Sequence, residues 1–121
     1  MPKILIADDS RFQVTLGALE YKGFEVVVAE DAMQAGMFAL RTVPDAIILD
    51  LSMPGGSGVD VLKRLKRSTK TRNIPVIIVT ASDDADLQEV TRQVGSADFF
   101  HKPVDLDQLA RTLSDLLSVR H

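Results

Sequence analysis

The chain has 121 residues, 45% hydrophobic and 26% charged, the composition of an ordinary globular protein with one domain, residues 1–121. The net charge of −3, with five Phe, one Tyr and no Trp, argues against nucleic acid as a partner. The absence of cysteine excludes disulfides and thiolate chemistry, and no apolar run reaches the roughly 18 residues of a membrane span. We expect a cytoplasmic protein, because the segment MPKILIADD also lacks the layout of a signal peptide.

Short apolar runs predict five β-strands. In chain order they are Lys3–Ala7, Glu25–Ala29, Asp45–Leu49, Pro75–Val79 and Ala97–Phe100. The first four are rich in Ile and Val and alternate little between apolar and polar residues. This pattern is typical of strands that are buried on both faces of a parallel sheet.

Segments with helical spacing of apolar residues separate these strands. The predicted helices follow, in chain order, Ser10, Asp31, Gly58, Asp84 and Asp105. Most of these residues suit the N-terminus of a helix, because their side chains can cap free backbone N–H groups. Strand and helix alternate five times, which predicts an α/β fold, an open parallel sheet with helices on both faces.

Acidic residues stand at the ends of two predicted strands. Asp8 and Asp9 end the first strand, and Asp50 ends the third. Open α/β sheets bind ligands beyond the carboxyl ends of their strands, so these carboxylates converge if the two strands are neighbours. Converging carboxylates repel one another unless a cation joins them. Because all the ligands are oxygen atoms and no histidine is near, the pattern favours Mg²⁺ over Zn²⁺.

Two more polar residues end the remaining strands. Thr80 ends the fourth strand and Lys102 follows the fifth, so a hydroxyl and an ammonium group lie at the same edge of the sheet. Lys102 could neutralise the acids or hold a transferred phosphoryl group. Taken singly, each acid could be a helix cap or turn residue, Thr80 a turn residue and Lys102 a solvated side chain. The joint order of the five residues favours one site.

Four short motifs match a known family. They are ADDS at 7–10, DLSMPGGSG at 50–58, VTA at 79–81 and GSADFFHKP at 95–103. With them the chain resembles the receiver domain of two-component response regulators over essentially its whole length. The resemblance implies a flavodoxin-like, doubly wound fold, with a five-stranded parallel sheet of order 2-1-3-4-5 and five helices.

The resemblance also implies roles for the acidic residues. Asp50 would accept a phosphoryl group from a phosphohistidine on a sensor histidine kinase or a histidine phosphotransfer protein. Asp9 would bind Mg²⁺ directly and Asp8 mainly through water. The backbone carbonyl of Ser52 would be the third protein ligand.

Further roles are implied around the acceptor. Thr80 would hydrogen-bond the phosphoryl group, Lys102 would pair with it, and the Lys102–Pro103 bond would be cis. Phe99 would swing inward when Thr80 moves, which would change partner binding on the face formed by the fourth helix, fifth strand and fifth helix. A downstream protein target is therefore expected, and many similar domains dimerise through this face on phosphorylation.

Other functions stay open. A Mg²⁺-dependent phosphatase with an aspartyl nucleophile would need a second Asp two residues after Asp50, where this chain has Ser52. A flavodoxin-like cofactor binder would need a phosphate-binding loop after the first strand, where the sequence reads ADDSRF. A receiver-like scaffold that works without phosphorylation is the third alternative. In the family that the chain resembles, the positions of Ser52 and Ser82 influence the lifetime of the phosphoryl group. Both residues are small and uncharged, so we expect no unusually fast self-dephosphorylation. We also expect no independent turnover of a separate substrate.

A basic cluster lies on the third predicted helix and the loop that leaves it. Of the fourteen basic residues, six lie in one ten-residue stretch, at Lys63, Arg64, Lys66, Arg67, Lys70 and Arg72. The simpler interpretation is a solvated helix face, and the alternative is a surface for an acidic partner. His101 and His121 belong to no catalytic or zinc-binding spacing.

Overall fold

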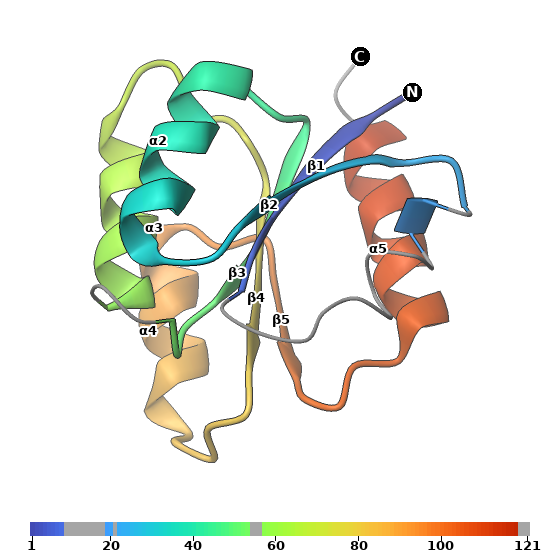
Figure 1. Ribbon diagram of the computed structural model, residues 1–121. Helices are drawn as coiled ribbons and strands as arrows, with labels where there is room; N and C mark the ends of the chain where they lie inside the picture. Colours follow the sequence, from blue (N-terminus) through green and yellow to red (C-terminus); the bar gives the residue numbers. More distant parts are fainter. Residues whose placement is uncertain (9–18, 21, 54–56, 119–121) are drawn as a thin grey trace.

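Five parallel strands form one sheet in the order β2-β1-β3-β4-β5 (Figure 1). The structure is a computed structural model that describes residues 1–8, 19–20, 22–53 and 57–118. The strands are β1 (Lys3–Ala7), β2 (Glu25–Ala29), β3 (Ala46–Asp50), β4 (Val76–Thr80) and β5 (Asp98–His101). The predicted fold class and strand order are confirmed.

The last three strands begin and end one residue later than the apolar runs predict. Backbone pairing sets these limits: Asp50 pairs with Val79, and Thr80 pairs with His101. Apolar character stops one residue earlier because the final position of each strand carries a polar side chain. Asp50 and Thr80 are therefore the last residues of β3 and β4, within the hydrogen-bonded sheet and one residue beyond the apolar runs.

Four helices are described: α2 (Ala32–Thr42), α3 (Gly58–Arg67), α4 (Asp86–Val94) and α5 (Leu106–Ser118). The helix predicted after Ser10 falls largely outside the described residues. Asp31 caps α2 as predicted, since its Oδ1 accepts a hydrogen bond of 2.8 Å from the Gln34 backbone N–H. Asp105 accepts one of 3.1 Å from the Gln108 N–H at the start of α5.

The helices cover the two faces of the sheet unequally among the described elements. Figure 1 shows α2, α3 and α4 on one side of the sheet and α5 on the other. The first face packs against small residues of α2, Ala32, Ala35 and Ala39, together with Leu62 of α3. The second face packs against α5 through fully buried leucines. Burial of each such leucine stabilises the fold by about 1.5–3 kcal/mol.

Across the residues described, no helix has both the length and the apolar character that crossing a bilayer requires.

Candidate functional site

The pairing of β1 with β3 brings two acidic residues together. Ala7 pairs with Leu49, so the next residues, Asp8 and Asp50, lie side by side at the carboxyl edge of the sheet. The backbone N–H of Asp8 donates to the carbonyl of Ala29 at 2.9 Å, which continues the pairing with β2. Both carboxylates are nearly fully buried, with side-chain exposures of 1% for Asp8 and 3% for Asp50.

One lysine joins the two buried carboxylates. The Nζ of Lys102 is 2.9 Å from Oδ2 of Asp8 and 3.0 Å from Oδ2 of Asp50. These are charge-assisted hydrogen bonds, and they compensate for part of the cost of burying two like charges. The sheet positions Lys102, because the backbone N–H of Lys102 donates to the backbone carbonyl of Thr80 at 2.8 Å. The bond from Lys102 to Pro103 is cis.

The surroundings favour the charged form of this lysine. Burial alone lowers the pKa of Lys102, but the hydrogen bonds that its ammonium donates to Asp8 and Asp50, and the negative charges of these residues, outweigh that effect. The pKa of Lys102 is therefore raised above its ordinary value. The side chain is 26% exposed, so Lys102 is neither solvated nor sealed from water. An incoming group can thus reach an ammonium that stays protonated.

The loop after β3 supports the second oxygen of Asp50. The backbone N–H of Ser52 donates to Asp50 Oδ1 at 3.0 Å, and this holds the carboxylate plane in place. Helix α3 begins close to this loop at Gly58. A Cβ atom at Gly58 would lie 2.5 Å from the Leu51 Cα and 3.0 Å from the Asp50 carbonyl oxygen. Only glycine therefore allows α3 to approach the Asp50 loop this closely.

Thr80 is fully buried, and its hydroxyl starts a chain of local hydrogen bonds. The Oγ1 of Thr80 accepts from the Ser82 N–H at 3.0 Å, and the Oγ of Ser82 accepts from the Asp84 N–H at 3.1 Å. Asp84 Oδ1 then accepts from the N–H of Asp86, the first residue of α4, at 2.9 Å. These hydrogen bonds connect the end of β4 to the start of α4, and no residue pattern in the sequence predicted them.

Phe99 packs at the sheet edge beside a histidine. It is partly buried against the core on the α2 and α3 side. Its ring centroid is 5.2 Å from that of His101, with an interplanar angle of 71°. The neighbouring Phe100 packs against the opposite core. Residues two apart in a strand share a face, so the spacing of Phe99 and His101 is a sequence signal for this edge-to-face contact.

The donor atoms suit a hard divalent cation. Asp8 and Asp50 offer carboxylate oxygens directed at the same amine, and oxygen ligands are those that Mg²⁺ prefers. Asp9, the predicted direct ligand, lies outside the described residues. Among the residues that are described, no three His, Cys, Asp or Glu side chains form a metal-binding group. The assignment of Asp8, Asp9, Asp50 and the Ser52 carbonyl as metal ligands therefore stays a prediction. The positions of Asp8 and Asp50 are compatible with it.

The chain matches the family described as response regulator receiver domain over residues 4–114. The chain belongs to this family. It is 33% identical to Protein PilH of Pseudomonas aeruginosa, covering 98% of this chain and 99% of PilH. It is 36% identical to the phosphate regulon transcriptional regulatory protein PhoB of the same organism, but spans only 51% of PhoB. The receiver domain of the Francisella response regulator 1452 superposes with a TM-score of 0.91 at 30% identity, covering 100% of both chains.

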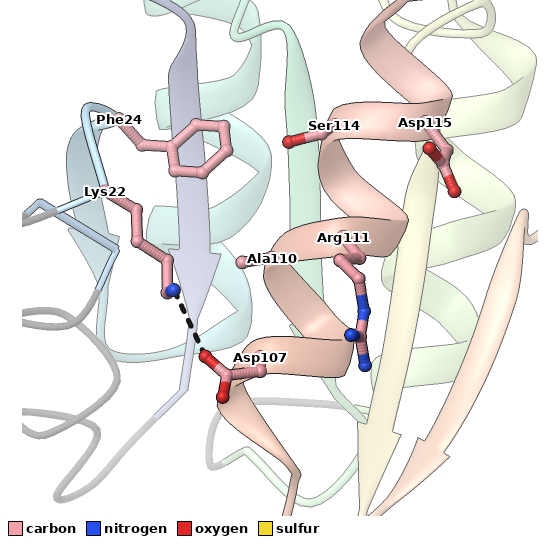
Figure 2. A pocket seen from close by; sticks show the side chains of 7 residues that line it. All are labelled: Lys22, Phe24, Asp107, Ala110, Arg111, Ser114 and Asp115. Atoms are coloured by element: carbon pink, nitrogen blue, oxygen red, sulfur yellow. Dashed lines mark ion pairs between the residues drawn. The ribbon is translucent and has the colours of Figure 1, made fainter.

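A cavity on this receiver is lined by neither Asp8 nor Asp50. It has a volume of about 380 Å³ and lies between α5 and the segment before β2 (Figure 2). Lys22 reaches across it, and its Nζ is 3.1 Å from Asp107 Oδ1. Both side chains are substantially exposed, so this pair contributes little to stability.

The basic cluster of the receiver is not uniformly solvated. Lys66 is about half-buried, and its Nζ donates to the backbone carbonyls of Arg72 at 3.1 Å and Ile74 at 3.0 Å. Burial lowers the pKa of Lys66. The expectation of a solvated helix face is thus wrong for Lys66, because its long stem reaches back to support the segment before β4. The other five basic residues are exposed.

Proposed function

We propose that this receiver is a phosphoacceptor switch in two-component signalling, with Asp50 as the acceptor. Receiver domains belong to two-component signal transduction. The observation that carries the proposal is the buried pair of carboxylates, Asp8 and Asp50, held by the single ammonium of Lys102. A purely structural role would be served equally well by apolar residues, which avoid the cost of burying charge. We further propose that residues 1–121 form one receiver domain.

The chemistry follows from the arrangement around Asp50. A carboxylate oxygen of Asp50 attacks the phosphorus of a phosphohistidine, an oxygen–phosphorus bond forms and the nitrogen–phosphorus bond to imidazole breaks. The leaving imidazole takes up a proton from water. Lys102 moves its hydrogen bond from the carboxylate to a phosphoryl oxygen and compensates its charge. The Ser52 N–H continues to orient the acceptor.

Receiver domains typically use Mg²⁺. We propose that Asp8, Asp9, Asp50 and the Ser52 carbonyl hold it, with Asp9 the direct ligand and Asp8 acting mainly through water. The cation would neutralise negative charge on the transferring group, which is the chemistry that oxygen-rich sites supply.

The hydrogen bonds that follow Thr80 suggest how the signal leaves the site. The hydroxyl of Thr80 accepts from Ser82 and still has its own proton to donate. A phosphoryl group on Asp50 provides strong acceptor oxygens, so the Thr80 hydroxyl turns toward them. Its hydrogen bond with the Ser82 N–H then breaks. The segment that leads into α4 then loses its anchor, and Phe99 moves into the space beside Thr80. The affected face is α4, β5 and α5.

The partners follow from this mechanism. The donor is a sensor histidine kinase or a histidine phosphotransfer protein, and the acceptor of the signal is a downstream protein that binds the α4, β5 and α5 face. A homodimer formed through this face on phosphorylation is an alternative readout. We propose a cytoplasmic location, where such donors present their phosphohistidines.

Intact mass spectrometry after incubation with acetyl phosphate tests the proposal. Wild type and Asp50→Asn are compared, each with Mg²⁺ and with EDTA. We expect a single phosphoryl adduct on wild type only, and only with Mg²⁺. An equal adduct on Asp50→Asn would contradict the assignment. Failure of folded wild type to react with acetyl phosphate or to bind beryllofluoride would instead favour the scaffold alternative.

A further inference from the structure

Helix α2 presents apolar side chains to solvent. Met33, Met37 and Leu40 are 69%, 42% and 48% exposed. Their spacing of four and three residues places them on one helix face. The face that packs on the sheet is a different one, formed by alanines. The helix is therefore apolar on two faces, and the outer one has no partner within the described residues.

These side chains border a groove between α2 and α3. The groove has a volume of about 260 Å³, and its floor includes Gly36, Leu65 and Thr71. Gly36 lies beside Arg64, since a Cβ atom there would be in ordinary van der Waals contact, 3.8 Å, with an Arg64 guanidinium nitrogen. A groove of this size accepts a few side chains of another chain rather than a large organic ligand.

The charge around the groove is positive. Arg64 lines it. Arg67 follows Arg64 by one turn on α3, and Arg41 follows Met37 by one turn on α2, so both extend the same faces. The lining contains no carboxylate. Asp60 precedes Arg64 by one turn, but the two form no salt bridge in the part of the chain that the structure describes.

We infer that this groove binds an acidic amphipathic helix of a protein partner. Apolar side chains of that helix, spaced at i, i+3 or i+4 and i+7, would contact Met33, Met37 and Leu40. Methionine side chains adapt readily to such partners. Carboxylates beside the apolar residues would pair with Arg41, Arg64 and Arg67, which provides the charge complementarity that selects the partner.

The same features argue against two other occupants. A second copy bound through this face about a two-fold axis would place the arginines of both copies against each other. A flat membrane surface would contact the exposed rim but not the groove floor at Leu65, which is only 4% exposed. The groove is also separate from the α4, β5 and α5 face, so this inference does not depend on the proposed phosphorylation switch.

A displayed library of helical peptides provides the test. Peptides are selected on the wild-type receiver after depletion on Met37→Glu, and binding is then measured by fluorescence polarisation. The matched control is Val90→Glu, since Val90 on α4 is 39% exposed, close to the 42% of Met37. Thermal unfolding of each variant confirms that it is folded.

We expect the selected peptides to be acidic with helically spaced apolar residues. They should bind wild type and Val90→Glu equally, and Met37→Glu and Arg64→Glu at least about ten-fold more weakly. Selected peptides that are neutral or basic, or that bind all variants alike, would overturn the inference. So would a wild-type dimer that Met37→Glu dissociates in sedimentation equilibrium, or binding to phosphatidylglycerol vesicles that Arg64→Glu abolishes.

Discussion

Lys102 and Asp50 lie 52 positions apart in the sequence, and in the structure the Lys102 Nζ is 3.0 Å from Asp50 Oδ2. The same Nζ contacts Asp8 at 2.9 Å, so one positive charge serves two buried negative charges. This arrangement makes the stability of the site sensitive to any change in the charge of these three residues.

Loss of the Lys102 charge should destabilise the receiver. In EDTA, Lys102→Met should lower the free energy of unfolding by about 3 kcal/mol, because two buried carboxylates lose their ion pairs with the Lys102 ammonium. Chemical denaturation measures the change. The control is Lys22→Met, whose ion pair with Asp107 is exposed and should contribute less than about 1 kcal/mol. Equal losses of unfolding free energy in the two variants would show that the Lys102 contacts stabilise the fold no more than an exposed ion pair does.

The stabilisation by Lys102 should depend on pH in the alkaline range. Its pKa is raised in the folded state, so its contribution is complete below the unfolded-state pKa of about 10.4 and is lost as pH rises through the higher folded-state value. The difference in unfolding free energy between wild type and Lys102→Met should therefore be constant from pH 7 to pH 9. It should then shrink at higher pH, and a difference that grows there would contradict the assignment.

Mg²⁺ should stabilise the wild-type receiver more than Asp50→Asn. In EDTA the variant should be more stable than wild type by about 1 kcal/mol, because it removes one of two like buried charges. With Mg²⁺ this difference in unfolding free energy should become smaller or change sign, since the variant retains fewer carboxylate ligands and gains less stability from binding the cation. Thermal melts across a Mg²⁺ titration measure both effects. Parallel shifts in the two proteins would exclude Asp50 as a ligand.

Gly58 should tolerate no side chain. Gly58→Ala places a Cβ atom 2.5 Å from the Leu51 Cα, so the loop that holds Asp50 must shift. We expect a loss of about 1–3 kcal/mol in unfolding free energy and slower phosphorylation by acetyl phosphate. Gly36→Ala is the control, since its Cβ meets only Arg64 at 3.8 Å, and there we expect a gain of about 0.5–1 kcal/mol. Matching losses at both sites would refute the steric account.

Phe99 should carry the response to phosphorylation. In Phe99→Ala, beryllofluoride with Mg²⁺ should still bind at Asp50 but cause smaller backbone amide chemical-shift changes in α4 and β5. Phe100→Ala is the matched control, because Phe100 packs on the opposite face of the sheet. If Phe99→Ala responds as wild type does, the switch involves other residues.

Sequence patterns predicted the sheet and the meeting of three polar residues at its edge. Apolar runs located all five strands to within one residue, and the polar residues at strand ends predicted that Asp8, Asp50 and Lys102 meet. This works because parallel strands have their carboxyl ends at one edge. Asp9 lies outside the described residues, so its role as a metal ligand is still a prediction.

Other features depend on how closely helices and loops pack against one another, which a sequence pattern does not reveal. The close contact of Gly58 with Leu51 arises only when α3 packs beside the Asp50 loop. The spacing of apolar residues after Asp31 predicts the buried alanines of α2, but it does not show that the methionines on another face of the helix stay exposed. The alanines are buried because α2 lies close to the sheet, where only small side chains fit. Lys66 similarly reaches backbone carbonyls that are six and eight residues later.

The central claim is that Asp50 accepts the phosphoryl group, and chemical mapping of the adduct tests it most directly. After incubation with acetyl phosphate and Mg²⁺, borohydride reduces an acyl phosphate to the alcohol, which converts the modified aspartate to homoserine. Peptide mass spectrometry then identifies the position. The account predicts homoserine at residue 50 alone, and none when Mg²⁺ is replaced by EDTA. Homoserine at another aspartate while Asp50 stays unmodified would contradict it.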